Sequence, residues 1–216
     1  MYTHIEKGGA FMEEQWLKWA KQLQAIAQAG LAYSKDVFDI ERFKMIRIIS
    51  LDIMAHHTDM EIKKIKDLFA NDTGYPTPKV DVRAAVFYSD QILMVQEKSD
   101  GKWSLPGGWA DIGYTPAEIA VKEVKEETGF DVKPVKLIAV FDKKCHPHPP
   151  SPFHVYKMMF QCELLGGKAK DSIETSDVRF FSENQLPPLS IHRITKEQIE
   201  LAFYHLKNPQ TPVYFD

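Results

Sequence analysis

Three glutamates, Glu123, Glu126 and Glu127, have the spacing in this sequence that is best suited to chemistry. A helix advances about 100° per residue, so Glu123 and Glu127 lie roughly 40° apart, with Glu126 roughly 60° to the other side. Like charges at this spacing repel by about a few tenths of a kcal/mol per pair. A bound cation would relieve that repulsion, and carboxylate oxygens suit Mg²⁺, Mn²⁺ or Ca²⁺. The alternative is a solvated acidic helix face balanced by Lys122 and Lys125.

A turn with two glycines, Gly107 and Gly108, precedes the glutamates. Glycine allows positive φ and a close approach of the backbone to a ligand. The residues that follow predict a helix over 116–128 that carries the glutamates beyond this turn. Its ends are indicated by an N-cap, a capping-box partner and a left-handed C-cap, which are Thr115, Glu118 and Gly129.

The stretch from Gly108 to Phe130 resembles the signature of the Nudix hydrolases, G-x5-E-x7-R-E-U-x-E-E-x-G-U, where U is aliphatic or aromatic. Two positions depart from it, because Tyr114 replaces the first glutamate and Lys122 replaces the arginine. Lysine keeps the charge but loses the planar two-pronged fork. Tyr114 removes an acid that assists the metal site in relatives, and Asp111 is a candidate substitute. The matching residues are Glu123, Val124, Glu126, Glu127, Gly129 and Phe130.

The resemblance continues outside the signature, over about residues 12–206. A helical N-terminal segment, with PKVDVRAAVF, GGWADIGYTP, DKKCHPHPPSPFH and LPPLS, is similar to a bacterial subgroup that carries a small helical N-terminal domain. Pyrophosphatases acting on CDP-choline or ADP-ribose belong to that subgroup. The resemblance implies a Nudix-type α/β/α sandwich with a mixed sheet, preceded by a small all-α domain.

The resemblance also implies a reaction. A nucleoside diphosphate linked to another group, first CDP-choline and then ADP-ribose, is cleaved to a nucleoside monophosphate and a phosphorylated product. Mg²⁺ or Mn²⁺ is expected on Glu123, Glu126 and Glu127, where it would bridge the diphosphate and activate water. Glu126, Glu127 or Glu174, which lies in a late loop, would take the proton. Substrate phosphates are expected near Gly107, Gly108 and Lys122.

Three further polar residues are candidates for substrate binding. Arg83 stands in an apolar strand, where it either forms a structural ion pair or points toward a phosphate or base. His146 and His148 lie between prolines that stiffen their loop. That loop is either an ordered packing segment or a pocket wall that hydrogen-bonds phosphate or nucleobase. Lys143 and Lys144 beside it favour phosphate.

Composition narrows the function classes. The 216 residues are 44% hydrophobic and 26% charged, which is typical of a globular protein. The net charge of −3 disfavours nucleic acid as a partner, although a local basic groove for RNA is compatible with it. Cys145 and Cys162 show neither metal-site spacing nor a disulfide framework. Without a long apolar run or a signal pattern, the expected location is the cytoplasm and no membrane contact is expected.

Two other functions use the same residues. A ligand-sensing domain that does not turn its ligand over would fit the change at Tyr114, but the intact row of glutamates disfavours it. A hydrolase that processes RNA would use the same metal site, and RNA binding with a steep salt dependence would support it.

Helical periodicity predicts three helices before the catalytic stretch, over 12–30, over 37–56 and from a capping box at Thr58–Glu61 to about 71. Three helices alone bury only a small hydrophobic core. We therefore expect them to form a homodimer or to pack on the next domain. Both Met1 and Met12 are candidate starts, and residues 1–11 are expected to be disordered. The inward stripes are predicted as Trp16, Trp19, Leu23, Ile26, Ala27 and Gly30, then Phe43, Ile46, Ile49, Ile53 and Met54.

After a linker at 74–78 the periodicity becomes that of strands. A closing helix begins at Thr195, where Gln198 completes a capping box, and runs to about Leu206. We therefore predict a helical domain over 1–73, a hydrolase domain over 79–207 and a tail over 208–216. The predicted strands are 80–88, 91–96, 103–105, 135–141, 155–164 and 178–181.

Overall fold

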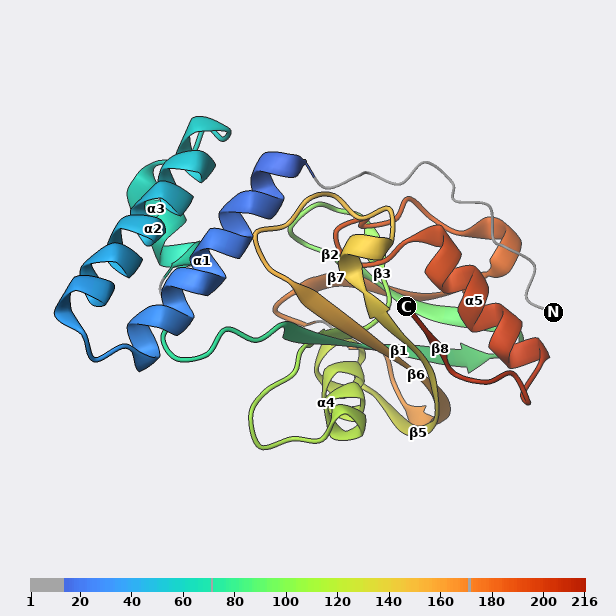
Figure 1. Cartoon of the computed structure of the whole chain (residues 1–216). Helices are drawn as coiled ribbons and strands as arrows, with labels where there is room; N and C mark the ends of the chain where they lie inside the picture. Colours follow the sequence, from blue (N-terminus) through green and yellow to red (C-terminus); the bar gives the residue numbers. More distant parts are fainter. Residues whose placement is uncertain (1–13, 71, 171) are drawn as a thin grey trace. The chain divides into compact units, whose positions relative to one another are not determined.

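The computed structural model describes residues 14–70, 72–170 and 172–216. Within them the chain forms two compact units, a helical unit of residues 14–78 with 150–154 and a sheet unit of residues 79–149 with 155–216 (Figure 1). The expected disorder of residues 1–11 and the candidate starts at Met1 and Met12 lie outside the described residues.

The helical unit consists of α1 (Gln15–Tyr33), α2 (Val37–His56) and α3 (Ile62–Phe69). Asp36 caps α2, because its side chain accepts hydrogen bonds from the backbone N–H groups of the two residues at the second and third helical positions. At Gly30 an added Cβ would meet the ring of Phe43 at 2.3 Å, so α1 and α2 approach closely at this glycine. A small core, formed by Leu17, Ala20, Leu51, Met54, Ile65 and Ala70, holds the three helices together.

Three predictions for the helical unit were wrong. One is the inward position of Ile49 in α2, since this side chain is 49% exposed. Thr58 does not begin α3, because its hydroxyl donates to the carbonyl of Met54 at 2.8 Å and so closes the end of α2. The inward stripe of α1 was predicted correctly at Ala27 but was otherwise displaced from the buried residues, which are Leu17, Ala20, Gln24, Ala27 and Gln28. Trp19 and Ile26 are instead more than half exposed. The helix carries apolar residues on two faces, and periodicity alone does not tell which face is inward.

The sheet unit contains an eight-stranded mixed sheet of order β3-β2-β1-β6-β5-β8, with β4 paired to β1 and β7 paired to β2. The pairs β1–β6 and β5–β8 are parallel and the others are antiparallel. Ser89 and Asp90 have φ of 48° and 59°, which makes the predicted tight turn between β1 and β2. The strands are β1 Lys79–Tyr88, β2 Gln91–Glu97, β3 Trp103–Ser104, β4 Gly107–Trp109, β5 Phe130–Asp142, β6 Val155–Gly167, β7 Thr175–Ser182 and β8 Tyr214–Phe215.

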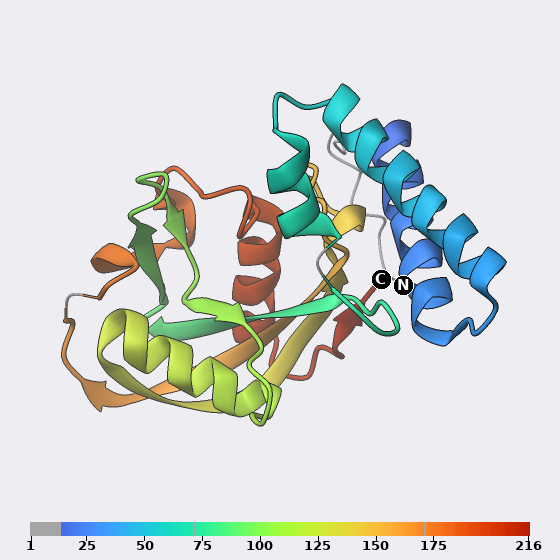
Figure 2. The same cartoon turned by 90° about the vertical axis from the view of Figure 1, so that its left-hand side faces the viewer.

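Helices α4 (Pro116–Thr128) and α5 (Lys196–Lys207) cover opposite faces of this sheet (Figure 2). The capping boxes predicted at Thr115 and at Thr195 are present, and Gly129 ends α4 in the left-handed conformation with φ of 81°. Apolar residues of α4 join one core and those of α5 join another. The expected α/β/α sandwich with a mixed sheet and preceding helices is thus confirmed. Short 3₁₀ helices, η1 (Lys143–Cys145) and η2 (Glu183–Gln185), complete the unit.

Strand pairing extends beyond the predicted strands. The glycine turn continues into β4, and the predicted tail contributes β8, whose Tyr214 pairs with Ala139 of β5. Strand β5 begins at Phe130, directly after α4, and passes Pro134 through a register shift that tolerates the missing N–H donor. Among the described residues, every helix is too short or too polar to cross a membrane.

Candidate active site

The glycine turn is pressed against β1. Gly107 and Gly108 pair with Arg83 and Val82 in the antiparallel β1–β4 ladder. Gly107 has φ of 144°, and an added Cβ would lie 2.0 Å from the carbonyl oxygen of Val82. Only glycine fits at this position, because a side chain would be both strained and in collision with the backbone. The backbone of Gly107 is therefore held in one position on β1.

Glu127 packs on that residue from α4. The side chain is buried, and one carboxylate oxygen accepts a hydrogen bond from the backbone N–H of Gly107 at 3.0 Å. Burial raises the pKa of Glu127 to about 8, while the charge of Arg83 and the hydrogen bond from Gly107 oppose the rise. A carboxyl group with such a pKa changes its charge near neutral pH and gains stabilisation from a nearby cation.

Glu123 lies one turn earlier against the second glycine. A Cβ added to Gly108 would be 3.1 Å from a carboxylate oxygen of Glu123, so the absence of a side chain there makes room for that carboxylate. Burial raises the pKa of Glu123, Lys122 lowers it, and the negative charges of Glu126 and Glu174 raise it further. The carboxylates are thus close enough to repel one another.

Glu126 is much more exposed than Glu123 and Glu127. Its side chain is 59% exposed, and one carboxylate oxygen lies 3.1 Å from the ammonium of Lys122. The same ammonium is 3.2 Å from Asp111 and 3.9 Å from Glu123. Hydrogen bonds with Glu126 and Asp111 raise the pKa of Lys122, so this group stays cationic. Lys122 therefore orients the surrounding acids, and Asp111, the candidate substitute for the missing glutamate, is held by it. Tyr114 is about half exposed.

The loop that carries Glu174 is tied to α4. The hydroxyl of Thr175 donates to the backbone carbonyl of Glu127 at 2.9 Å. Ser172 accepts hydrogen bonds from the backbone N–H groups of Glu174 and Thr175, and Lys98 donates to the carbonyl of Ser172 at 2.7 Å. Glu174 itself is exposed, and its charge acts on Glu123. The structure thus brings this predicted base to the edge of the glutamate cluster.

The donor set fits a hard divalent cation without forming a complete site. Across the described residues, no three His, Cys, Asp or Glu side chains converge closely enough to be a ready-made metal site. Glu123 and Glu127 nevertheless offer partly or fully buried carboxyl groups whose pKa values are raised by burial. Oxygen donors of this kind suit Mg²⁺ or Mn²⁺. Glu126 would join them after releasing Lys122.

The guanidinium of Arg83 is buried and hydrogen-bonded to other groups of the protein. Its Nε donates to Asp81 at 2.9 Å, and its Nη1 donates to the carbonyl of Leu105 at 3.1 Å and to the hydroxyl of Ser104 at 3.2 Å. Asp81 also accepts from Lys157, a fully buried residue. Sequence reasoning missed Lys157, although a lysine within the apolar run of β6 was a signal. These contacts favour the structural ion pair over direct contact with substrate.

The two histidines of the proline-rich loop have different environments. His148 is buried, its Nδ1 lies 2.7 Å from the carbonyl oxygen of Ile191, and burial lowers its pKa to about 3. The imidazole is therefore neutral and donates through Nδ1. His146 contacts a carboxylate oxygen of Asp216 at 3.0 Å. These contacts favour an ordered packing loop, and neither histidine is brought to the glutamates by a contact in the described structure.

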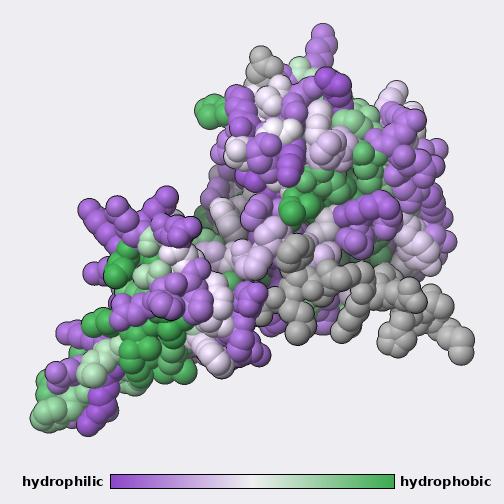
Figure 3. Space-filling view, turned by 90° about the horizontal axis from the view of Figure 1, so that it is seen from above, coloured by the Kyte–Doolittle hydropathy of each residue, from purple (hydrophilic) through white to green (hydrophobic). Residues whose placement is uncertain are grey.

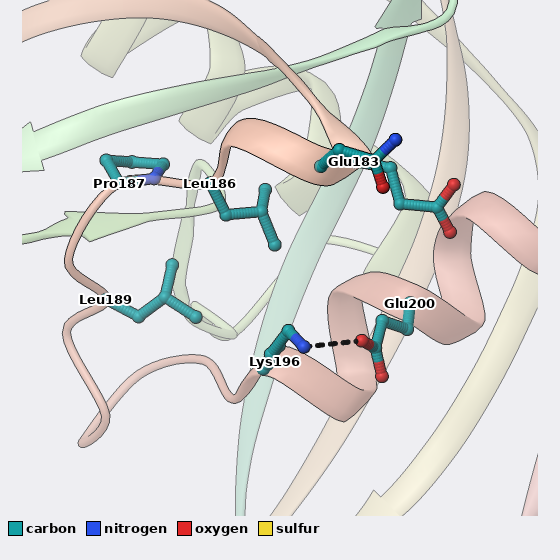
Figure 4. A pocket seen from close by; sticks show the side chains of 7 residues that line it. Glu183, Leu186, Pro187, Leu189, Lys196 and Glu200 are labelled. Carbon is teal, nitrogen blue, oxygen red and sulfur yellow. Dashed lines mark ion pairs between the residues drawn. The ribbon is translucent and has the colours of Figure 1, made fainter.

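A cavity of about 660 Å³ lies between η2 and the start of α5 (Figure 4). Lys196, the one cation among its lining residues, is paired with Glu200 at 3.0 Å. The cavity therefore presents no free positive charge to a phosphate. None of its lining residues was a predicted site residue; they are Glu183, Asn184, Leu186, Pro187, Leu189, Lys196 and Glu200.

Comparisons with known proteins assign both parts of the chain. Residues 14–69 match the family described as a UDP-X-like N-terminal oligomerisation domain, and residues 77–202 match the NUDIX domain. The chain is 47% identical over 205 residues to a putative ADP-ribose pyrophosphatase, YjhB, of Bacillus subtilis, which covers 95% of this chain and 99% of that protein.

Solved structures give the same picture. The crystal structure of a UDP-X diphosphatase is 35% identical, covers 93% of this chain and 98% of its own, and superposes with a TM-score of 0.61. The crystal structure of an ADP-ribose pyrophosphatase from Streptococcus suis is 44% identical, covers 65% of this chain and 100% of its own, and has a TM-score of 0.60. Both parts of the chain therefore have relatives of known fold.

Proposed function

This chain belongs to the Nudix hydrolase family, and we propose that it cleaves the diphosphate of ADP-ribose to AMP and ribose 5-phosphate. The name of the Bacillus subtilis relative, which matches nearly the whole chain, supports this substrate. The UDP-X diphosphatase relative supports the wider class of nucleoside diphosphates linked to a second group. CDP-choline, the first expectation from the sequence, becomes the second candidate.

The proposed metal ligands are Glu123, Glu126 and Glu127, with Mg²⁺ or Mn²⁺ as the ion. The observation that carries this proposal is the packing of one buried carboxyl group, Glu127, and one partly buried carboxyl group, Glu123, against the glycine turn at Gly107 and Gly108. When bound, the ion would neutralise the diphosphate charge and lower the pKa of a coordinated water. Ionisation of Glu127, whose pKa is about 8 in the metal-free protein, would accompany binding.

The remaining roles fall to side chains around the carboxylates. Lys122 would exchange Glu126 for a phosphate oxygen while keeping Asp111, because its ammonium has three donors. Glu174 is the proposed base. Its carboxylate makes no hydrogen bond or ion pair in the part of the chain that the structure describes. Its negative charge raises the pKa of Glu123, so the two carboxylates are close enough to interact. It would accept the proton of the attacking water, and its anchored loop would limit its motion.

The test is phosphate release from a substrate panel in the presence of Mg²⁺ or Mn²⁺ and a coupled phosphatase. The panel contains ADP-ribose, CDP-choline, UDP-linked sugars, NAD and the nucleoside triphosphates. Metal-dependent release that is strongest with ADP-ribose is expected. Release from another member alone would refute the substrate. Binding of a ligand without any release would replace the enzyme by a ligand-sensing module, and cleavage of RNA ends alone would favour the RNA-processing alternative.

A homodimer through the helical unit is part of the proposal. Trp19, Ile26 and Tyr33 of α1 follow one another at seven-residue intervals and are all at least half exposed. Phe38 and Met45 of α2 have the same interval and exposure. Apolar residues at this spacing pack into a partner helix. The description of the matched N-terminal domain as an oligomerisation domain also supports a second copy as the partner.

Hydrophobic side chains gather on the surface of these helices, at the left of the view in Figure 3. Large exposed apolar patches on a soluble chain mark interaction surfaces. We call the five residues Trp19, Ile26, Tyr33, Phe38 and Met45 the apolar face of the helical unit.

A further inference from the structure

We propose that Lys157 and Asp81 are positioning residues for catalysis, which act by holding Arg83 and, through it, the glycine turn under Glu127. The inference rests on the proposed function and names the device that keeps the metal-binding carboxylate in place. It concerns residues that do not touch the substrate and that the Nudix signature does not include.

The first link is a buried ion pair between two parallel strands. Asp81 of β1 and Lys157 of β6 are direct neighbours in the β1–β6 ladder. The ammonium of Lys157 donates to one carboxylate oxygen of Asp81, and Nε of Arg83 donates to the other at 2.9 Å. All three side chains are at most 9% exposed. One carboxylate is therefore shared by two cations in the interior.

The second link runs from Arg83 to the turn. Nη1 of Arg83 donates to the carbonyl oxygen of Leu105, which lies two residues before Gly107. The next residue, Pro106, accepts a hydrogen bond from the backbone N–H of Ala84 at 2.9 Å. Gly107 then donates to Glu127. A displacement of Arg83 therefore moves the backbone segment whose N–H binds the catalytic carboxylate.

The charges of Lys157, Asp81 and Arg83 also support a positioning role. Lys157, Asp81 and Arg83 together carry one net positive charge, because two cations share one anion. Within this group, the charge of Arg83 acts on Glu127 and on Glu97, a buried acid that is also paired with Arg193 at 3.0 Å. Loss of Lys157 would leave Asp81 and Arg83 as a neutral pair. Arg83 would then be drawn toward Asp81 and away from the carbonyl of Leu105.

Stability alone does not account for this arrangement. Replacing a buried ion pair by apolar residues of similar volume is often neutral or stabilising, because charges lose their hydration in the interior. Burial lowers the pKa of Lys157 to about 8 even though Asp81 opposes the change. The loss of hydration of the charged lysine is therefore not fully offset by its ion pair. Apolar residues at both position 81 and position 157 would fill this part of the interior with less loss of hydration. We therefore assign to Lys157 the role of holding Asp81, and through it Arg83, in one geometry.

The experiment compares Lys157→Met with wild type by steady-state kinetics and by hydrogen exchange of the Gly107 amide. We expect kcat to fall by about tenfold or more while KM changes by less than about threefold, because small displacements of catalytic groups reduce rates without removing binding contacts. Exchange of the Gly107 amide should accelerate. Ser104→Ala removes one acceptor of Arg83 without changing any charge, and a smaller loss of kcat is expected; it decides the matter if Lys157→Met does not fold.

Ile199→Val in α5 is the control, because it removes a buried methyl group from the other core. At an equal loss of thermal stability it should leave kcat and Gly107 exchange unchanged. Unchanged kcat and exchange in folded Lys157→Met, or an equal effect of Ile199→Val, would overturn the positioning role. Absence of turnover by wild type would instead refute the proposed function, and Gly107 exchange would still test the inference.

Discussion

The backbone N–H of Gly107 donates to a carboxylate oxygen of Glu127 at 3.0 Å, and this bond joins the glycine turn to the middle of the candidate site. The two residues are 20 positions apart in the sequence. The bond fixes one oxygen of a buried carboxyl group and leaves the other available to a ligand. It also makes the geometry of the turn a condition for the chemistry, since the turn is itself held by β1.

Substitution of Gly107 should be far more harmful than substitution of another glycine with positive φ. Gly107→Ala places a methyl group 2.0 Å from the carbonyl oxygen of Val82 and should lower the free energy of unfolding by about 2–4 kcal/mol. Gly101→Ala is the control, because Gly101 has φ of 68° and nothing within 4 Å of an added Cβ; about 1 kcal/mol is expected there. Urea unfolding measures both, and equal losses would show that the turn is not packed as described.

The raised pKa of Glu127 predicts an unusual dependence of stability on pH. Its pKa in the folded state, about 8, exceeds the ordinary value of 4.5. Between pH 4.5 and about pH 8, Glu127 is therefore protonated in the folded state and ionised in the unfolded state. The contribution of Glu127 to the free energy of unfolding therefore falls as pH rises from about 4.5 to about 8 and is constant above. Added Mg²⁺, which binds the ionised carboxylate, should stabilise the protein more at pH 9 than at pH 6.

Urea unfolding with EDTA and with Mg²⁺ at several pH values is the measurement. Glu127→Gln should reduce both the decline with pH and the stabilisation by Mg²⁺, because glutamine has no ionisation in this range. Glu163→Gln, at an exposed position of β6, is the matched control and should behave as wild type. The assignment to Glu127 is lost if the two variants show the same pH dependence.

The apolar face of the helical unit should decide the oligomeric state. Ile26→Glu or Met45→Glu puts a charge where a partner helix would pack and should convert a dimer to a monomer in light scattering with size-exclusion chromatography. Leu165→Glu, at a residue of β6 that is 64% exposed, tests whether any added surface charge has this effect. A wild-type monomer, or a dimer that survives both helix substitutions, would place the interface elsewhere.

Local signals gave the centre of the fold from the sequence. The capping box at Thr115, the left-handed Gly129 and the row of glutamates between them depend on neighbours within one helix, and the structure contains all of these features. The tight turn at Ser89 and Asp90 is local in the same sense. Such features are predictable because few residues decide them.

Features that depend on distant partners were not predictable in this way. Burial of Lys157 follows from its pairing with Asp81, 76 residues earlier, in a parallel ladder whose register no local pattern sets. Glu126 was grouped with Glu123 and Glu127 by helical angle alone, but its side chain is exposed and forms an ion pair with Lys122. Roles in catalysis and metal binding stay predictions for all of these residues.

Hydrolysis of ADP-ribose by wild type and by Glu127→Gln, with Mg²⁺ and at pH 8, tests the central claim most directly. The account predicts metal-dependent turnover by wild type and a loss of about 10²-fold or more in kcat for the variant, with an unchanged circular dichroism spectrum. Glu163→Gln should retain full activity. Undiminished turnover by folded Glu127→Gln would contradict the assignment of this carboxylate to the metal site, and with it the proposed active site.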